Sequence, residues 1–573
     1  MRARATTVLV VSLLLTSVPS GGEAIASPPA RGDEVSSSDR LGPPAGVKRL
    51  PALLVPRAED ALSRALRGGR ISAGRYALER VLSLFDLREV RSRYGFVARP
   101  DPRSATLLMR DLVVRLDQLS PAERTKARRI LARPTDGMHD PGGDGYATAE
   151  APPFCATNTC VHYVTTTVDA PPLEDEDTSL VPDYVEATSG VLEDVWDAEV
   201  VGLGYRAPKS DVTSDNNGGN GLLDVYLADI GADGGLYGYC TTDDPNLDPS
   251  YPYWDMSAYC VLDNDYDISQ YGYPDPMDPL QVTAAHEFFH AIQFAYDIGE
   301  DAWLMEGTAT WVEEHVYDDI NDNRQFLADS PLSKPTRPLD KNTGFQVYGG
   351  WIFWQFLTEY LGGTSPDPRI VRATWRRADG SPAGQDMYST QAVASAVGAR
   401  RIGGTRWRFR WAFADFAVWN ARPSAFYDEG AAYAAATVAR SVSLTRAAPS
   451  VRSTAQLDHL ANRFVVVRRG SGLKATARLR ITVDGPNHGT GPEASVVVIR
   501  KSGAVAYRVV DLNSSGNGAI TVAFGTTVAR VVVIMTNAST RYTNCYSGLT
   551  PFACDGGVPL DQNRTYAFRA AVI

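Results

Sequence analysis

The sequence predicts an α+β protein with an N-terminal helical segment, a central mixed domain and a C-terminal β-sandwich. Three observations support this prediction. Apolar residues recur at helical spacing over residues 57–66, 70–84 and 104–119. The centre combines a strand-like run at 161–168 with several long helical stretches. Past residue 454, short β-branched runs separated by Gly, Pro and Asn turns replace the helices.

The first 26 residues have the composition of a secretory signal peptide. Arg2 and Arg4 precede an apolar core at 8–15, and the small-residue triplet at 24–26 provides a cleavage site. This core is too short to cross a bilayer, and no later segment is long and apolar enough to do so. We therefore expect a secreted, extracellular product without a membrane anchor.

The six cysteines are compatible with export, because an exported chain meets an oxidising compartment. Nearest-neighbour pairing is the simplest of the 15 possible connectivities. A cysteine metal site is the weaker interpretation, since no C-x-x-C spacing occurs. The expected disulfides are Cys155–Cys160, Cys240–Cys260 and Cys545–Cys554.

Charge divides the chain into a basic block and an acidic block. Residues 31–140 carry about 22 basic and 14 acidic side chains, whereas residues 141–330 carry about 3 basic and 38 acidic ones. Such an inversion favours docking of the first block on the second, as an inhibitory or folding-assisting propeptide would dock. Two solvated surfaces are the plainer alternative. The overall net charge of -11 argues against nucleic acid as a partner.

Composition and pattern give four expected parts. A signal peptide (1–26) precedes a propeptide (27–140) that starts as a Pro/Gly/Ser-rich stretch. Residues 134–150 have the composition of a linker, and we expect the propeptide to be cleaved within residues 134–154. A central domain (141–447) and a β-sandwich (448–573) follow. The main helices expected in the central domain are 182–199, 282–296, 302–316, 345–360 and 407–419. The sandwich is expected to hold about seven strands, at 464–467, 475–483, 495–499, 504–510, 519–524, 529–535 and 566–572.

The segment 283–297 contains the motif H-E-x-x-H on an apolar, helical background. His286 and His290 lie four residues apart, so a helix presents both imidazoles on one face to one metal ion. Glu287 occupies the position from which a general base can take a proton from the attacking water. The plainer alternative is a helix whose histidines pair with hydrogen-bonding groups of the core.

A zinc hydrolase needs a third protein ligand and an open fourth position. Glu306 lies 16 residues after His290, in the sequence WLMEGTATWVEE, where a second helix can return and present a carboxylate. Glu313 lies two turns further on the same helical face, so we expect it to orient a ligand histidine. A third histidine ligand at position 296 is excluded, because that residue is Tyr296.

HEFFH followed by WLMEGTATW resembles the gluzincin metallopeptidases, over about residues 280–360. The motif echoes the N-E-G-x-A motif of zinc aminopeptidases, with Met305 in place of its Asn, and no motif for binding a free amine is present. The layout of the whole chain is similar to that of uncharacterised secreted bacterial metalloproteases. The resemblance implies a zincin-like domain, one catalytic zinc held by His286, His290 and Glu306, and catalysis by Glu287.

Gluzincins stabilise the oxyanion with a Tyr or His from a later helix. Tyr348, just before Gly349-Gly350 and the aromatic helix, is the expected residue here. Tyr317 and His315 are the alternatives, and Tyr348 could instead be a core aromatic residue.

The aspartate-rich loop 210–227 carries closely spaced oxygen ligands among glycine turns, which suits calcium. The spacing of these residues is not that of an EF-hand. The plainer interpretation of the loop is that its Asn-Gly pairs only form turns. The candidate ligands for a structural calcium ion are Asp211, Asp215, Asn220 and Asp224.

These features favour a secreted zinc endopeptidase that hydrolyses peptide bonds in a protein or peptide substrate. Two alternatives stay open at this point. An inactive zinc domain could carry a binding or adhesion module, or the zinc site could hydrolyse a non-peptide bond.

Overall fold

A computed structural model describes residues 50–54, 56, 59–136, 145–232, 235–248, 250–363, 365–402, 404–548 and 550–573. The expected signal peptide, the Pro/Gly/Ser-rich stretch up to residue 49 and residues 137–144 of the expected linker lie outside the described residues. All described residues belong to one compact unit. Within them, no helix has the length and apolar character needed to cross a membrane.

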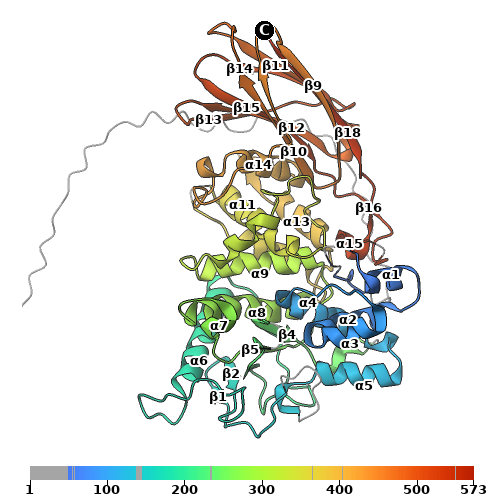
Figure 1. Cartoon of the computed structure of the whole chain (residues 1–573), viewed down its shortest axis with the longest axis vertical. Coiled ribbons are helices and arrows are strands. Elements are labelled where there is room, and N and C mark those ends of the chain that lie inside the picture. Colours follow the sequence, from blue (N-terminus) through green and yellow to red (C-terminus); the bar gives the residue numbers. More distant parts are fainter. Residues whose placement is uncertain are drawn as a thin grey trace, which may run out of the picture. The chain divides into compact units, whose positions relative to one another are not determined.

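The N-terminal segment is helical, as the periodicity predicts (Figure 1). Its helices are α1 (Ala61–Arg67), α2 (Ala73–Phe85), α3 (Leu87–Tyr94), α4 (Ala105–Val113) and α5 (Pro121–Ile130). Ser120 and Glu123 form a capping box that starts α5. The helix expected at 104–119 ends at Val113, where the side chain of Arg115 donates to the Asp111 carbonyl that the helix leaves free.

The central domain contains a five-stranded mixed sheet in the order β1-β2-β3-β5-β4. Strands β2, β3 and β5 are parallel, and the edge strands β1 and β4 are antiparallel to their neighbours. The strand expected at 161–168 is Thr159–His162 instead, and the chain bends from residue 165 onward, where Thr167 has a positive φ of 76°. The strands are β1 (Phe154–Cys155), β2 (Thr159–His162), β3 (Leu223–Ala228), β4 (Gly238–Thr241) and β5 (Tyr259–Asp263).

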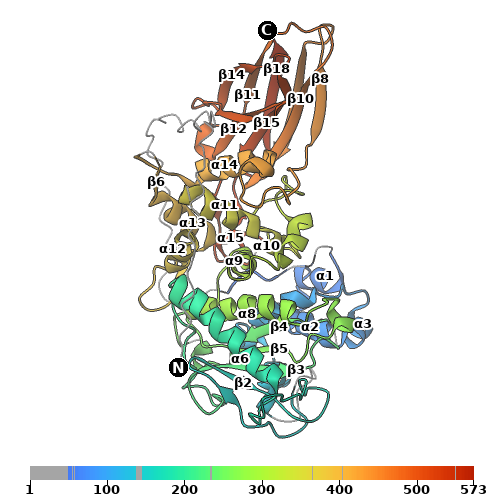
Figure 2. The same cartoon turned by 90° about the vertical axis from the view of Figure 1, so that its left-hand side faces the viewer.

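Helices cover this sheet and continue into an all-helical region. Helix α8 packs against β4, β5, α6 and α9, as Figures 1 and 2 show. The aromatic helix expected at 345–360 is split in two at Gly350; a Cβ on the adjacent Gly349 would meet Ser330 at 2.8 Å, so the chain turns through a close backbone contact. The helices are α6 (Asp183–Trp196), α7 (Ile268–Tyr271), α8 (Met277–Asp297), α9 (Ala302–Val316), α10 (Gln346–Gly349), α11 (Trp351–Gly362), α12 (Arg369–Ala378), α13 (Ser389–Gly398) and α14 (Phe409–Ala421).

Two sheets form the C-terminal part, with one apolar core between them. Nine strands build them, against about seven expected. Strands β8 and β9 were missed, because their exposed, polar residues show little hydrophobic signal. One sheet has the order β13 (Val505–Val509), β12 (Pro492–Arg500), β15 (Val528–Asn537), β10 (Ala461–Arg469), β8 (Arg440–Leu444). The other has the order β14 (Asn517–Ala523), β11 (Arg478–Asp484), β18 (Arg564–Val572), β9 (Ser450–Leu457).

The predicted domain boundary at 447/448 is therefore too late, since β8 already pairs with β10 from Arg440 onward. Helix α14 lies against the outer face of this sheet, where Ala417 and Val418 share an apolar cluster with Val466 and Val532 (Figure 2). The predicted nearest-neighbour disulfides are confirmed. They join Cys155 to Cys160, Cys240 to Cys260 and Cys545 to Cys554.

Candidate metal centre

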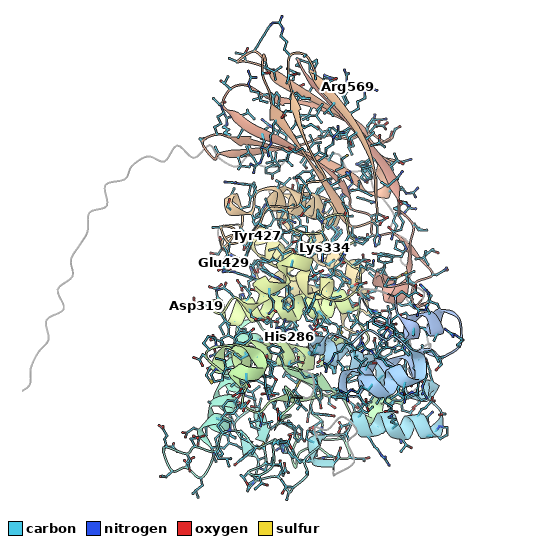
Figure 3. All side chains as sticks on the ribbon, in the orientation of Figure 1. His286, Asp319, Lys334, Tyr427, Glu429 and Arg569 are labelled. Atoms are coloured by element: carbon cyan, nitrogen blue, oxygen red, sulfur yellow. A yellow bond between two sulfur atoms is a disulfide. The ribbon has the colours of Figure 1, made fainter. Side chains whose placement is uncertain are left out.

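Helices α8 and α9 bring His286, His290 and Glu306 together in the protein interior. The two Nε2 atoms of His286 and His290 lie 3.1 Å apart, and Glu306 Oε2 lies 3.2 Å from the first and 3.6 Å from the second. His286 is labelled in Figure 3. Three candidate ligand atoms from two adjacent helices thus lie close together, as the motif and the following E-G pair predict.

The sequence around Glu306 explains how α9 can lie so close to its neighbours. A Cβ on Gly307 would meet the indole nitrogen of Trp354 at 2.9 Å, so glycine at this position lets α11 approach α9. Around it, α9 is buried on all sides, with Trp303 and Trp311 almost fully enclosed. The close packing fixes the carboxylate of Glu306 on a rigid element, which a metal ligand requires.

Both histidines are oriented by a second hydrogen bond. Glu313 accepts from, or shares a proton with, His286 Nδ1 at 2.5 Å, as the sequence predicts. Gln293 Oε1 lies 2.7 Å from His290 Nδ1, and its amide nitrogen donates to the Met305 carbonyl at 2.9 Å. Each imidazole therefore directs its Nε2 atom toward the shared point, with its tautomer set by its Nδ1 partner.

The electrostatics of Glu306 suit a cation. Burial acts to raise the pKa of its carboxyl, but the hydrogen bonds with His286 and His290 outweigh burial and lower the pKa to about 2. The other oxygen of Glu306, Oε1, is buried without a hydrogen-bond partner among the described residues. One carboxylate and two imidazoles are the donor set of a zinc site with one position left open. The buried, unbonded oxygen of Glu306 is consistent with such a site.

Glu287 follows His286 on α8 and lies against the edge strand β4. A Cβ on Gly238 of β4 would meet the Glu287 side chain at 3.1 Å, so this glycine allows the strand to lie against the carboxylate. Glu287 also lines a cleft, together with His286 and Tyr348. The expected general base therefore lies in a cleft beside the candidate ligands.

The N-terminal helical segment fills part of this cleft. Thr106 of α4 is fully buried, and its hydroxyl donates to Glu287 Oε2 at 2.8 Å. The same hydroxyl accepts from the backbone N–H of Cys240 on β4 at 2.9 Å. Thr106 thus connects the edge strand to the expected general base, although 181 residues separate it from Glu287 in the chain.

Tyr348, the expected oxyanion-stabilising residue, lies at the same cleft. Its hydroxyl donates to the carbonyl oxygen of Arg103 at 2.7 Å, and its ring lies 6.0 Å from that of His286. Burial raises the pKa of Tyr348, which keeps its hydroxyl protonated and able to donate. The alternatives Tyr317 and His315 do not line the cavity, and His315 instead stacks on Trp311.

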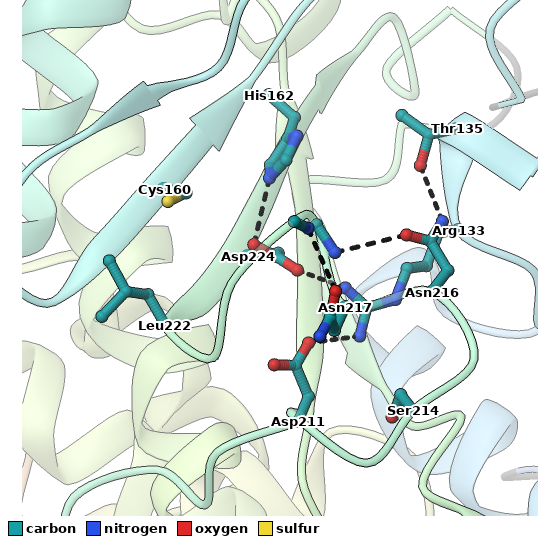
Figure 4. A network of polar contacts seen from close by, with 12 residues as sticks. Arg133, Thr135, Cys160, His162, Asp211, Ser214, Asn216, Asn217, Leu222 and Asp224 are labelled. Carbon is teal, nitrogen blue, oxygen red and sulfur yellow. Dashed lines mark hydrogen bonds and ion pairs between the residues drawn. The ribbon is translucent and has the colours of Figure 1, made fainter.

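The aspartate-rich loop does not gather the four candidate calcium ligands into one group. Asp211 and Asp224 converge on the guanidinium of Arg133, which lies at the end of the N-terminal helical segment (Figure 4). Asp215 is exposed, and Asn220 bonds within its own turn to the backbone of Leu222. A basic side chain thus occupies the position between the two buried aspartates.

This Arg133 network is extensive and buried. Arg133 is 1% exposed, donates to Asp211 at 2.6 Å and to Asp243 at 2.8 Å, and also pairs with Asp224. His162 holds the far oxygen of Asp224 at 3.0 Å. Here the basic and acidic blocks of the sequence meet through specific ion pairs rather than through diffuse charge.

Three residues near the centre escaped the sequence analysis. Thr106 and Gln293 carry no motif of their own, and only the fold brings them to Glu287 and His290. Glu199 is the third: it lies in a π-helical stretch that continues α6, is fully buried, and burial raises its pKa strongly although the charge of His286 lowers it. Single π-helical turns often mark functional sites, but they leave no pattern in a lone sequence.

The chain matches no protein-family model, and no curated protein sequence matches it. Among solved structures, PliG of Aeromonas hydrophila, a periplasmic inhibitor of g-type lysozyme, is 10% identical, with a TM-score of 0.15, over 23% of this chain and 98% of that one. The pre-peptidase C-terminal domain of a Bacillus anthracis collagenase is 9% identical, with a TM-score of 0.15, over 24% and 97%.

A third structure, the surface-associated copper-binding protein CorA of Methylomicrobium album BG8, is 11% identical, with a TM-score of 0.15, over 23% of this chain and 98% of its own. At these TM-scores the likenesses carry no argument about fold or function. The functional conclusion therefore rests on the residues and geometry of this chain.

Proposed function

We propose that this chain is the precursor of a secreted, gluzincin-like zinc endopeptidase. The observation that carries the proposal is the convergence of His286, His290 and Glu306 on one point, with Glu287 in a cleft beside it. A central sheet with an antiparallel edge strand, β4, next to the motif helix α8 supports a zincin-like domain, since such an edge can bind an extended peptide. Three disulfides support export.

His286, His290 and Glu306 would hold the zinc ion, which would supply Lewis-acid polarisation to the scissile carbonyl and to the attacking water. Glu287 accepts the proton of that water as it attacks and then passes it to the leaving amine. Tyr348 donates its hydroxyl to the carbonyl oxygen as negative charge develops there. Glu313 and Gln293 keep the imidazoles aligned through both steps.

The N-terminal helical segment acts in this proposal as an inhibitory propeptide. Thr106 takes up the Glu287 carboxylate and the Cys240 N–H, two groups that a substrate would need. Arg133 anchors the far end of the segment on the acidic domain. Removal of the segment would free the cleft, and it would also free the Asp211–Asp224 pair for a divalent cation such as calcium.

Casein hydrolysis tests the proposal. The secreted, processed protein is compared with its Glu287→Ala variant, and zinc is quantified in both. Activity in the parent, a loss of at least about 1,000-fold in the variant and about one zinc per chain in each would support it. Absence of zinc from the parent would remove the metallopeptidase proposal and favour a binding module.

A further inference from the structure

The side chain of Arg103 lies in the cleft beside the candidate metal centre, half-buried and enclosed by aromatic and polar groups. Its guanidinium carbon is 4.5 Å from the ring centroid of Tyr237 and 5.3 Å from that of Phe326. Its Nη1 atom donates to the side-chain oxygen of Gln325. A guanidinium between two ring faces, with a fixed acceptor at its edge, is a binding arrangement for a planar cation.

A carboxylate completes the enclosure. Asp322 lines the same cavity, at the start of the 3-10 helix that also carries Gln325 and Phe326. It is itself held in place, because Tyr273 donates to one of its oxygens and Gln325 to the other at 2.6 Å. Burial acts to lower the pKa of Arg103, but its interaction with Tyr237 and the charge of Asp322 raise it, so the pocket favours a positive charge.

The backbone of Arg103 lies in the cleft, next to the residues expected to carry out catalysis. Its carbonyl accepts from Tyr348, and three residues later Thr106 bonds to Glu287 and to the edge strand β4. Tyr348, the expected oxyanion-stabilising residue, therefore donates to the carbonyl oxygen of Arg103. The segment is coiled here, as a 3-10 turn (Pro102–Ser104) that leads into α4, so it occupies the cleft without presenting an extended peptide bond.

We propose that Tyr237, Asp322, Gln325 and Phe326 form a substrate subsite for an arginine side chain, and that Arg103 occupies it as an internal substrate mimic. This inference rests on the proposed peptidase function and adds the substrate class: polypeptides with arginine at the residue whose carbonyl contacts Tyr348. We expect lysine to bind less well. Its ammonium group is not planar, so it cannot stack between the two rings and donate to Gln325 at the same time.

A binding experiment tests the subsite without any need for catalysis. Arg103→Ala empties the pocket in the full chain, and Arg103→Gln does so with a side chain of closer size if the alanine variant does not fold. Isothermal titration then compares Nα-acetyl-L-arginine amide with its citrulline analogue, which has the same shape and no charge. We expect arginine amide to bind at least about tenfold more tightly, and the added change Asp322→Asn to remove most of that preference.

Equal affinity for the two amides would overturn the inference, as would equally tight binding of arginine amide to the parent chain, in which Arg103 fills the pocket. Hydrolysis by the processed protein provides the second test, with peptide pairs that differ only in arginine against citrulline. Cleavage of both members at the same kcat/KM, with zinc present, would leave the peptidase standing and refute the arginine subsite. Selective binding without zinc or cleavage would leave the subsite standing and refute the peptidase.

Discussion

The hydroxyl of Thr106 donates to the carboxylate of Glu287 at 2.8 Å, so the N-terminal helical segment is hydrogen-bonded to the group that we expect to move protons. The bond is buried, and it is shared with the Cys240 N–H of the edge strand. One oxygen of the Glu287 carboxylate is thereby occupied by the N-terminal helical segment. The contact thus links the docked segment directly to the chemistry of the cleft.

Thr106→Val keeps the shape of the side chain and removes its hydroxyl. We expect this variant to raise the peptide-hydrolysing activity of the intact, unprocessed chain by about tenfold, since a buried hydrogen bond to a charged group contributes about 1.5–3 kcal/mol. A fluorogenic peptide assay on zinc-loaded, full-length protein measures it. Thr125→Val, on the exposed face of α5, is the matched control and leaves the activity at the parent level. Equal activity in the Thr106 variant and the parent would contradict the inhibitory role.

Gln293→Ala removes the partner of His290 Nδ1 without touching a ligand atom. We expect zinc affinity to fall by about 10–100-fold, because a ligand imidazole without its second hydrogen bond loses its orientation. Competition with a chromogenic chelator measures the Kd. Gln456→Ala, on an exposed strand of the sandwich, should bind zinc like the parent. An unchanged Kd for the Gln293 variant would show that Gln293 does not position the histidine.

Arg133→Leu removes the cation that pairs with the buried carboxylates of Asp211 and Asp224. We expect the free energy of unfolding to fall by about 3–5 kcal/mol, because the variant leaves buried charges without a partner. Urea denaturation followed by fluorescence measures the loss. Arg128→Leu, on the exposed face of α5, should change stability by less than about 0.5 kcal/mol. If the free energy of unfolding of Arg133→Leu changed as little as that of Arg128→Leu, the ion pairs of Arg133 would not hold the N-terminal segment in place.

His459 and Asp340 make stability depend on pH, through a contact between the helical region and the sandwich. Their atoms lie 2.8 Å apart, Tyr542 donates to the same carboxylate at 2.6 Å, and Asp458 lies nearby. Burial acts to lower the pKa of His459, but the charge of Asp340 raises it above its ordinary value near 6.5. Burial acts to raise the pKa of Asp340, and the charge of His459 lowers it.

A histidine with a raised folded pKa stabilises the fold below about pH 6.5 and loses that contribution as pH rises through the folded value. We therefore expect the difference in Tm between the parent and His459→Gln to be largest near pH 5.5 and to shrink toward pH 9. Calorimetric scans across this range measure it. His488→Gln, in a turn of the sandwich, is the control and should show a difference that does not vary in this way. A constant difference for His459 would contradict the coupling.

The sequence predicted the parts that repeat a local pattern. Helix α9 spans Ala302–Val316, as the periodicity indicates, and H-E-x-x-H with the following E-G pair identifies three groups that the structure brings together. These predictions succeed because spacing on one helix, and a short return to the next, are nearly fixed by helix geometry. The nearest-neighbour disulfides succeed for a similar reason, since short loops favour local pairing.

The remaining features depend on contacts between distant residues. Thr106 and Glu287 lie 181 residues apart, and Arg133 meets Asp211 and Asp224 only after the two blocks dock. The opposite charges of the two blocks indicated that they attract each other. They could not show that the guanidinium of Arg133 lies between Asp211 and Asp224, which the sequence suggested as calcium ligands. Strands β8 and β9 were missed because each is an edge strand in which only two or three apolar residues alternate with exposed polar ones, which is a weak signal.

Zinc stoichiometry tests the central claim most directly. The full chain, its His290→Ala and Glu306→Ala variants and a His315→Ala control are dialysed against sub-stoichiometric competing chelator and analysed by mass spectrometry for metal. We predict about one zinc in the parent and in the His315 control, because His315 is exposed on α9 and stacks on Trp311. We predict less than about a tenth of that in the other two variants. Equal zinc in all four proteins, or none in the parent, would contradict it.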